Sequence, residues 1–408
     1  MASTGTAPRL PAVTRRGLLL GAGSAVAWAG IPRFARAAGR DPRLVVVVLR
    51  GALDGLAAVP PVGDRDYPAL RTDLAIGLGG GGATRLDGFF ALNDAMPATL
   101  GLYRARQALI VHAAATPYRQ RSHFDGQDVL ENGTTSPGGS ASGWLNRAVA
   151  ALPVAARVGR HEGLAVGATT PLILRGKAPT LSWTPPSFRP VGEDTRERLA
   201  SLYSHTSPRL AKVFAEAEDL GRIAAADDPE KAGHGAVAAF SAPAEGMARL
   251  LAADDGPRVA AISYEGWDTH VKEGADKGRL ARYLGALDAA FRAMKDGLGP
   301  AWNDTVVVAV TEFGRTAHEN GSGGTDHGTA TVAFLLGGAV AGGRMVAKWP
   351  GLSSARLYQD RDLAPTTDLR AVLKGVLHDH LGLSDRALAE QVFPDSASVR
   401  PLDGLLQA

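Results

Sequence analysis

Short runs of apolar, β-branched residues alternate along the chain with segments of helical periodicity. Residues 44–49 form a continuous apolar run, typical of a strand buried on both faces of a parallel sheet. Further strands are expected at 108–112, 259–264, 305–311 and 332–336. Helices are expected from Asn93 to about 104, from Ser122 onward, and at 144–152, 279–295 and 369–381. This alternation predicts an α/β fold, doubly wound, with a mainly parallel sheet and helices on both faces.

The pattern changes between about residues 168 and 255. A Pro- and Trp-containing stretch at 182–186 is followed by helical segments near 195–203, 209–224 and 242–252. We interpret this region as a mostly helical insertion that caps the site, within a domain that spans 38–408.

The first 37 residues carry the pattern of an export signal. The pair Arg15-Arg16 precedes a mildly apolar stretch at 17–31, and Ala35-Arg36-Ala37 supplies the small residues of a cleavage site. Twin arginines with a weakly apolar core favour a twin-arginine (Tat) signal over an ordinary Sec signal or an uncleaved anchor. We therefore expect the Tat translocase as a partner, a periplasmic or secreted protein, and no transmembrane span in the mature chain.

Composition excludes several function classes. The chain has 408 residues with 45% hydrophobic and 21% charged, which excludes wholesale disorder. It contains no Cys, so disulfides, thiol catalysis and Cys-ligated metal sites are excluded. Five of its 44 basic residues lie in the first 37 positions, leaving 39 against 41 acidic residues in the body. A nucleic-acid partner is therefore not expected.

Polar residues gather where the predicted strands end. In an open α/β sheet, ligands bind beyond the carboxyl ends of the strands. Each residue alone has an ordinary alternative, such as a turn acid or a hydrogen-bonded His. Together they favour a shared site, because buried acids and imidazoles are costly unless they are paired or metal-bound. The candidate metal ligands are Asp54, His123, Asp268, His270, Glu312, Asp326 and His327.

Acids and imidazoles without thiols suit a divalent metal: zinc, manganese, calcium or magnesium, with iron as a further alternative. Ser122 stands where a helix begins, so it is either a nucleophile near the positive helix end or simply the N-cap. Arg119 and Arg121 either clamp a phosphate or sulfate group or are solvated loop charges.

These segments resemble the domain-of-unknown-function family 1501 of exported bacterial proteins, which is placed in the alkaline phosphatase superfamily with the sulfatases. The resemblance rests on LRGALDGL at 49–56, RSHFDGQ at 121–127, GWDTH at 266–270, TEFGRT at 311–316 and GTDHG at 324–328. It covers nearly all of the mature chain.

The resemblance implies roles for individual residues. Asp54 would be the metal-ligating acid after the first strand, and Ser122 the nucleophile that opens a helix. Asp268 and His270 resemble the acid–His pair of one metal, and His327 the final His ligand.

The sequence departs from the superfamily at Glu312-Phe313. The superfamily usually has an adjacent Asp-His pair there, and the Asp268/His270 spacing is also shorter than usual. One metal, a remodelled site and lost catalysis are all compatible with these departures.

Two functions from different classes follow. The first is an exported metal-dependent hydrolase acting on a phosphate or sulfate ester of a small molecule or glycan, in which Arg119, Arg121 or Arg315 balances the anionic transition state. The alternative is a non-catalytic exported protein that uses the same fold to bind an anionic glycan, a metal or a partner, such as a neighbour-encoded exported protein. A weaker third reading is a redox metalloenzyme that holds iron.

Overall fold

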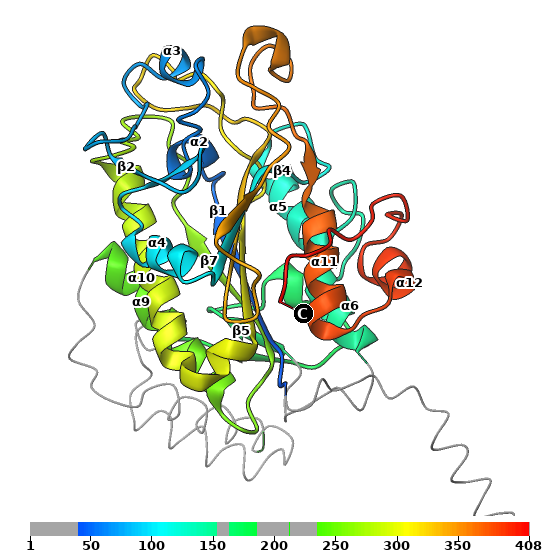
Figure 1. Ribbon diagram of the computed structural model, residues 1–408. Coiled ribbons are helices and arrows are strands. Elements are labelled where there is room, and N and C mark those ends of the chain that lie inside the picture. Colours follow the sequence, from blue (N-terminus) through cyan, green and yellow to red (C-terminus); the bar gives the residue numbers. More distant parts are fainter. Residues whose placement is uncertain (1–39, 153–162, 186–211, 213–234, 408) are drawn as a thin grey trace, which may run out of the picture. The chain divides into compact units, whose positions relative to one another are not determined.

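The apolar runs of the sequence assemble into one sheet of nine strands. Figure 1 shows the computed structural model, which describes residues 40–152, 163–185, 212 and 235–407. The strand order of the sheet is β10-β4-β9-β8-β1-β7-β5-β6, and β11 also pairs with β4. All but one of the described residues belong to the unit Asp41–Ala408. The strands of this sheet are β1 Arg43–Arg50, β4 Ala108–Ala115, β5 Gly163–Val166, β6 Thr180–Trp183, β7 Val259–Glu265, β8 Thr305–Val310, β9 Thr331–Leu336, β10 Arg344–Val346 and β11 Thr367–Asp368.

One strand runs against the others. β9 is antiparallel to both β4 and β8, whereas every other pairing in this sheet is parallel. The segment before β9 therefore reaches the edge at which the parallel strands end. The predicted α/β class and mainly parallel sheet are confirmed.

Helices cover both faces of the sheet. The pair α9 (Ala236–Ala252) and α10 (Arg279–Leu298) packs on one face with α4 (Pro97–Arg104). The other face is covered by α5 (His123–Asn132), α6 (Trp144–Ala151) and α11 (Leu369–Leu381), and Figure 1 shows the two groups on opposite sides of the strands. The shorter elements are β2 Ala83–Arg85, β3 Ala91–Asn93, α2 Gly55–Ala58, α3 Tyr67–Leu70, α12 Asp385–Ala387, and the short turns η2 Leu172–Leu174, η4 Gly299–Asp304, η5 Ser354–Arg356 and η6 Leu388–Val392.

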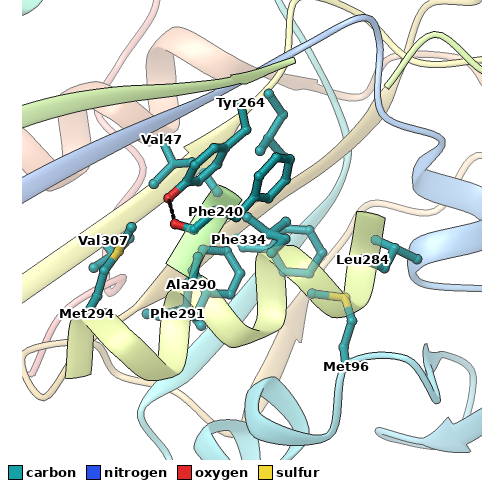
Figure 2. Packing of buried hydrophobic residues seen from close by; sticks show 14 of the residues in the cluster. Val47, Met96, Phe240, Tyr264, Leu284, Ala290, Phe291, Met294, Val307 and Phe334 are labelled. Carbon is teal, nitrogen blue, oxygen red and sulfur yellow. Dashed lines mark hydrogen bonds between the residues drawn. The ribbon is translucent and has the colours of Figure 1, made fainter. Parts of the chain in front are cut away.

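The core under α9 and α10 shows why these runs are buried. Figure 2 shows Phe240 of α9 stacked on Tyr264 of β7, with ring centroids 4.1 Å apart. The Tyr264 hydroxyl donates to the Phe240 carbonyl at 2.7 Å, so the one polar atom of this contact has a partner. Alternate residues of β1 face opposite cores, with Val47 in this one and Val46 in the other.

One predicted helix start is wrong. Asn93 does not cap α4: it ends β3, its side chain accepts from Ala95 N, and the helix begins at Pro97. The region expected as an insertion, 168–255, includes β6, which is an edge strand of the sheet, and α9, which packs on β7. The expected helices near 195–203 and 209–224 lie almost wholly outside the described residues, as does the signal at 1–37.

Candidate metal centre

Three imidazoles and one carboxylate converge beyond the carboxyl ends of the strands. His123 Nε2 and His270 Nε2 lie 2.8 and 2.9 Å from His327 Nε2. Asp268 Oδ1 lies 3.0 Å from His270 Nε2, 3.4 Å from His327 Nε2 and 3.5 Å from His123 Nε2. Within the described chain, His123, Asp268 and His327 form a group whose ligand atoms all lie within 4.8 Å of one another, and His270 contacts two of its three members.

These residues come from three segments of the chain that meet at the carboxyl edge of the sheet. His123 is the first residue of α5, after β4, and Asp268 and His270 follow β7. His327 precedes β9 and pairs in an isolated bridge with Arg315, which follows β8. Because β9 is antiparallel, its beginning meets the ends of β7 and β8.

A glycine lets the loops close on one another. Gly51, directly after β1, has φ +118°, and a Cβ there would lie 2.6 Å from Asp268 N. Its own N–H donates to Glu312 Oε1 at 2.9 Å. The end of β1 therefore packs against the backbone that carries Asp268, which only glycine permits.

The second nitrogen of each imidazole is held by an acceptor. His123 Nδ1 lies 2.8 Å from Glu312 Oε1, and His270 Nδ1 lies 3.1 Å from Asp326 Oδ1. His327 Nδ1 lies 2.9 Å from the carbonyl of residue 121. The structure therefore places Glu312 and Asp326, both expected as metal ligands, behind the imidazoles, as outer acceptors that orient the rings.

These acceptors determine what the site can bind. A carbonyl or an ionised carboxylate only accepts hydrogen bonds, so each Nδ1 carries a hydrogen, and a ring that is neutral then turns the lone pair of Nε2 inward. Three lone pairs then face one another and a carboxylate, which repels unless a proton or a cation lies among them. A tetrahedral ion with bonds of about 2.1 Å needs donor atoms about 3.4 Å apart, and the distances from Asp268 Oδ1 to His327 Nε2 and His123 Nε2, 3.4 and 3.5 Å, match this. The Nε2 atoms lie closer together, at 2.8 and 2.9 Å, so the rings would move slightly apart around an ion. The residues present fit a metal ion.

The pKa shifts of two imidazoles differ in direction. The hydrogen bond that His123 donates to Glu312 raises the pKa of His123 and favours its protonated ring, whereas burial lowers the pKa of His327 and favours its neutral ring. Burial also acts to raise the pKa of Asp268, but the hydrogen bond and charge of Arg315 more than offset it and leave that pKa below its ordinary value. In Glu312 the hydrogen bond from His123 offsets burial in the same way and lowers the pKa. The carboxylates are thus ionised at neutral pH.

The three candidate arginines are engaged by the protein itself. Arg315 is buried and donates to Asp268 Oδ1 at 2.7 Å and to Thr325 Oγ1 at 3.1 Å. Arg121 is paired with Asp362, with Nη2 and Oδ2 2.7 Å apart. Arg119 donates to backbone carbonyls, at 2.7 Å for that of Tyr118. Each guanidinium thus has protein acceptors, whereas the sequence left open a substrate anion or, for Arg119 and Arg121, bulk solvent.

Ser122 lies at the N-cap of α5, beside His123. Its side chain makes no capping hydrogen bond, and its N–H donates to the Tyr118 hydroxyl at 3.2 Å. The interpretation of Ser122 as a mere cap is therefore weakened, because its half-buried hydroxyl is not used to close the helix end.

Asp54 lies outside the imidazole cluster. It caps α2 by accepting from Leu56 N at 3.0 Å and forms a fully buried ion pair with Arg71. Arg71 also donates to the carbonyls of Ala317 and Thr316 at 3.0 and 2.7 Å. Glu273, equally buried, neighbours Asp54, and burial and the charge of Asp54 raise its pKa well above the ordinary value.

Several polar residues near the site were not identified from the sequence. Gln127 donates to Glu312 Oε1 at 3.1 Å and accepts from Arg50 at 2.9 Å. Its spacing of four from His123 on one helix could have revealed it, because such residues share a face. Arg71 and Glu273 carried no such signal, since both lie in irregular segments.

A match to a protein-family model identifies the chain. The model, described as a protein of unknown function (DUF1501), matches residues 105–393, and the chain belongs to this family. The membership predicted from the motifs is confirmed. No curated protein matches the chain.

Similar solved structures are all distant. A phosphonate monoester hydrolase of Agrobacterium radiobacter is 14% identical, with a TM-score of 0.37, over 84% of this chain and 74% of that one. A putative sulfatase from Bacteroides thetaiotaomicron is 11% identical, with a TM-score of 0.37, over 90% and 76%. The TAB5 alkaline phosphatase is 12% identical, with a TM-score of 0.35, over 73% and 92%. The activity of this chain is therefore argued from its own residues.

Proposed function

We propose that this protein binds one divalent metal ion through His123, Asp268 and His327, with His270 beside them, and hydrolyses a phosphate or sulfate ester. The observation that carries the proposal is the convergence of three Nε2 atoms on the Asp268 carboxylate. In this cluster of described residues, the Nε2 atoms and the Asp268 carboxylate face one another, and the protein does not supply a separate hydrogen-bond donor for each of them.

The donor set narrows the choice of metal. Calcium and magnesium prefer oxygen ligands, whereas imidazole suits zinc, iron and related ions. Of the four metals expected from the sequence, we therefore favour zinc. When bound, such an ion supplies a Lewis acid that polarises the ester oxygen.

The remaining chemistry would come from the chain itself. Ser122 is the proposed nucleophile, because its hydroxyl is free of the cap and lies next to His123. The N–H groups of the first turn of α5 and its positive end favour a bound anionic group there. Phe313, buried with its ring centroid 5.0 Å from that of His123, would exclude water from the inner side of the site.

A non-catalytic binding protein remains the second candidate. It is favoured by the engagement of Arg119, Arg121 and Arg315 with protein acceptors, which leaves the balance of an anionic transition state to the metal and the helix end. Such a protein would bind an anionic glycan, a metal or an exported partner.

We also propose that the protein is exported by the Tat pathway to the periplasm or beyond. The support is the twin-arginine pattern at 1–37. Among the described helices, none combines the length and apolar character needed to cross a bilayer. Replacing Arg15 and Arg16 by Lys is expected to leave the protein in the cytoplasm, and export of that variant at the wild-type level would contradict the proposal.

Metal content of the full chain tests the main proposal. The wild type, folded in the cytoplasm, is expected to hold about one equivalent of metal by mass spectrometry, and an Asp268→Asn/His327→Ala double variant none. His378→Ala, which removes an exposed imidazole on α11, is the matched control and should keep the metal. A metal-free wild type would overturn the metal-dependent hydrolase. With metal present, loss of ester turnover in Ser122→Ala supports the hydrolase, whereas no turnover of any ester by the wild type favours the binding protein.

A further inference from the structure

Arg121 has a backbone conformation that a residue with a Cβ rarely adopts. Its φ is +61°, in the left-handed region, and it stands two residues before His123. In this conformation its carbonyl accepts the hydrogen bond of His327 Nδ1 at 2.9 Å. An observed backbone outlier beside a cluster of ligand atoms calls for a function of its own.

The side chain of Arg121 explains how this conformation is held. Nε and Nη2 lie 2.9 and 2.7 Å from Asp362 Oδ2, and Nη2 donates to Gln359 Oε1 at 2.6 Å. Asp362 is fully buried and also accepts from Thr329 Oγ1 at 2.7 Å. The guanidinium is thus anchored to a carboxylate fixed in the fold.

We propose that Arg121 is a positioning residue for the metal centre. Its anchor on Asp362 locks the left-handed backbone, which aims the carbonyl at His327 Nδ1 and fixes the lone pair of His327 Nε2 toward the ion. This inference rests on the proposed metal site. It assigns Arg121 a role through its backbone, in place of the substrate clamp expected from the sequence.

Two substitutions separate the backbone from the side chain. Arg121→Ala and Arg121→Gly both remove the guanidinium, but only glycine tolerates positive φ without strain. We expect the Kd for zinc, measured by competition with a chelating dye, to rise about 10- to 100-fold in the Ala variant, the usual range for a lost outer partner. The Gly variant should lose clearly less. The ¹⁵N shifts of His327 in the metal-free protein should show the Nδ1–H tautomer weakened most in the Ala variant.

Arg106 supplies a matched control. It is an exposed arginine with φ +60° in the turn before β4, at the end of that strand opposite to the metal centre. Arg106→Ala and Arg106→Gly should leave the Kd for zinc unchanged, which separates a general effect of strain from an effect on the site.

The outcomes distinguish the two proposals. A wild type that binds no zinc overturns the metal site itself. Wild-type binding with an unchanged Kd in Arg121→Ala overturns the positioning role, and equal losses in the Ala and Gly variants would assign the effect to charge and overturn it also. If Arg121→Ala does not fold, Asp362→Asn, which weakens the anchor without touching residue 121, is expected to raise the Kd. An unchanged Kd in that variant counts against the inference.

Discussion

Two polar clusters lie at the carboxyl edge of the sheet, and they differ in how their charges are satisfied. In the deeper one, Asp54 is closed by Arg71, whose other N–H groups donate to two carbonyls. In the metal centre, three imidazoles and Asp268 present acceptors to one another, although Arg315 holds Asp268 from outside. A closed cluster stabilises the fold and leaves nothing to bind a ligand. An open cluster keeps acceptors available for a ligand, which is why we assign the proposed metal site to the imidazoles.

The largest expected effect tests the closed cluster. Arg71→Met removes the partner of a buried carboxylate, so we expect the free energy of unfolding to fall by about 3–5 kcal/mol, measured by denaturant titration. Metal stoichiometry in the folded fraction should stay at the wild-type level. The control is Arg386→Met, which breaks the exposed pair with Glu390 (3.0 Å) and should leave stability almost unchanged. A loss of metal in Arg71→Met at retained stability would mean that Asp54 belongs to the metal centre after all.

A smaller effect probes the support of the open cluster. Gln127→Ala removes a donor to Glu312, which in turn holds His123. Gln127 contacts Glu312 and not an imidazole, so its loss should matter less than the loss of an acceptor that holds an imidazole. We expect the Kd for zinc to rise about three- to tenfold, with little change in stability. Gln391→Ala, on the exposed part of η6, is the matched control. Equal Kd values in both variants would show that the carboxylate needs no such support.

The smallest effect concerns pH and the closed cluster. The pKa of Glu273 is raised by burial and by Asp54, so its contribution to stability is fully present below the ordinary pKa of Glu and is lost as pH rises toward the folded pKa. Glu273→Gln mimics the protonated acid. We expect its melting temperature to exceed that of the wild type by a few degrees at pH 8 and to match it near pH 4.

The neighbouring acid does not disturb that comparison. Arg71 holds the pKa of Asp54 below its ordinary value against the opposing effect of burial, so the stability from Asp54 is lost only as pH falls. A hydrogen bond from protonated Glu273 also lowers that pKa, and the amide introduced at residue 273 can donate in its place, so the loss is expected in both proteins. A melting difference that does not change with pH would show that Glu273 is ionised in the fold.

The sequence predicted the layers better than the roles of individual residues. Strand β1 and helix α10 follow from the apolar pattern alone, and the rule for open sheets predicts that the loops after β1, β7 and β8 meet at one edge. The same rule cannot distinguish a Glu312 that would bind the ion directly from a Glu312 that accepts a hydrogen bond from His123, because both arrangements fit the same sequence pattern. The direction of β9 and the left-handed backbone of Arg121 are likewise set by tertiary contacts that no local pattern records.

The antiparallel course of β9 has a consequence for how the chain matures. His123 and His327 meet across a separation of 204 residues, and the hairpin that carries His327 forms only once β8 and β9 are both in place. Contacts of such long range form late in folding. A nascent chain that has not yet delivered residue 327 cannot complete the proposed centre, so ion uptake would require β9 to have joined β8, whereas β10 and β11 follow later in the chain.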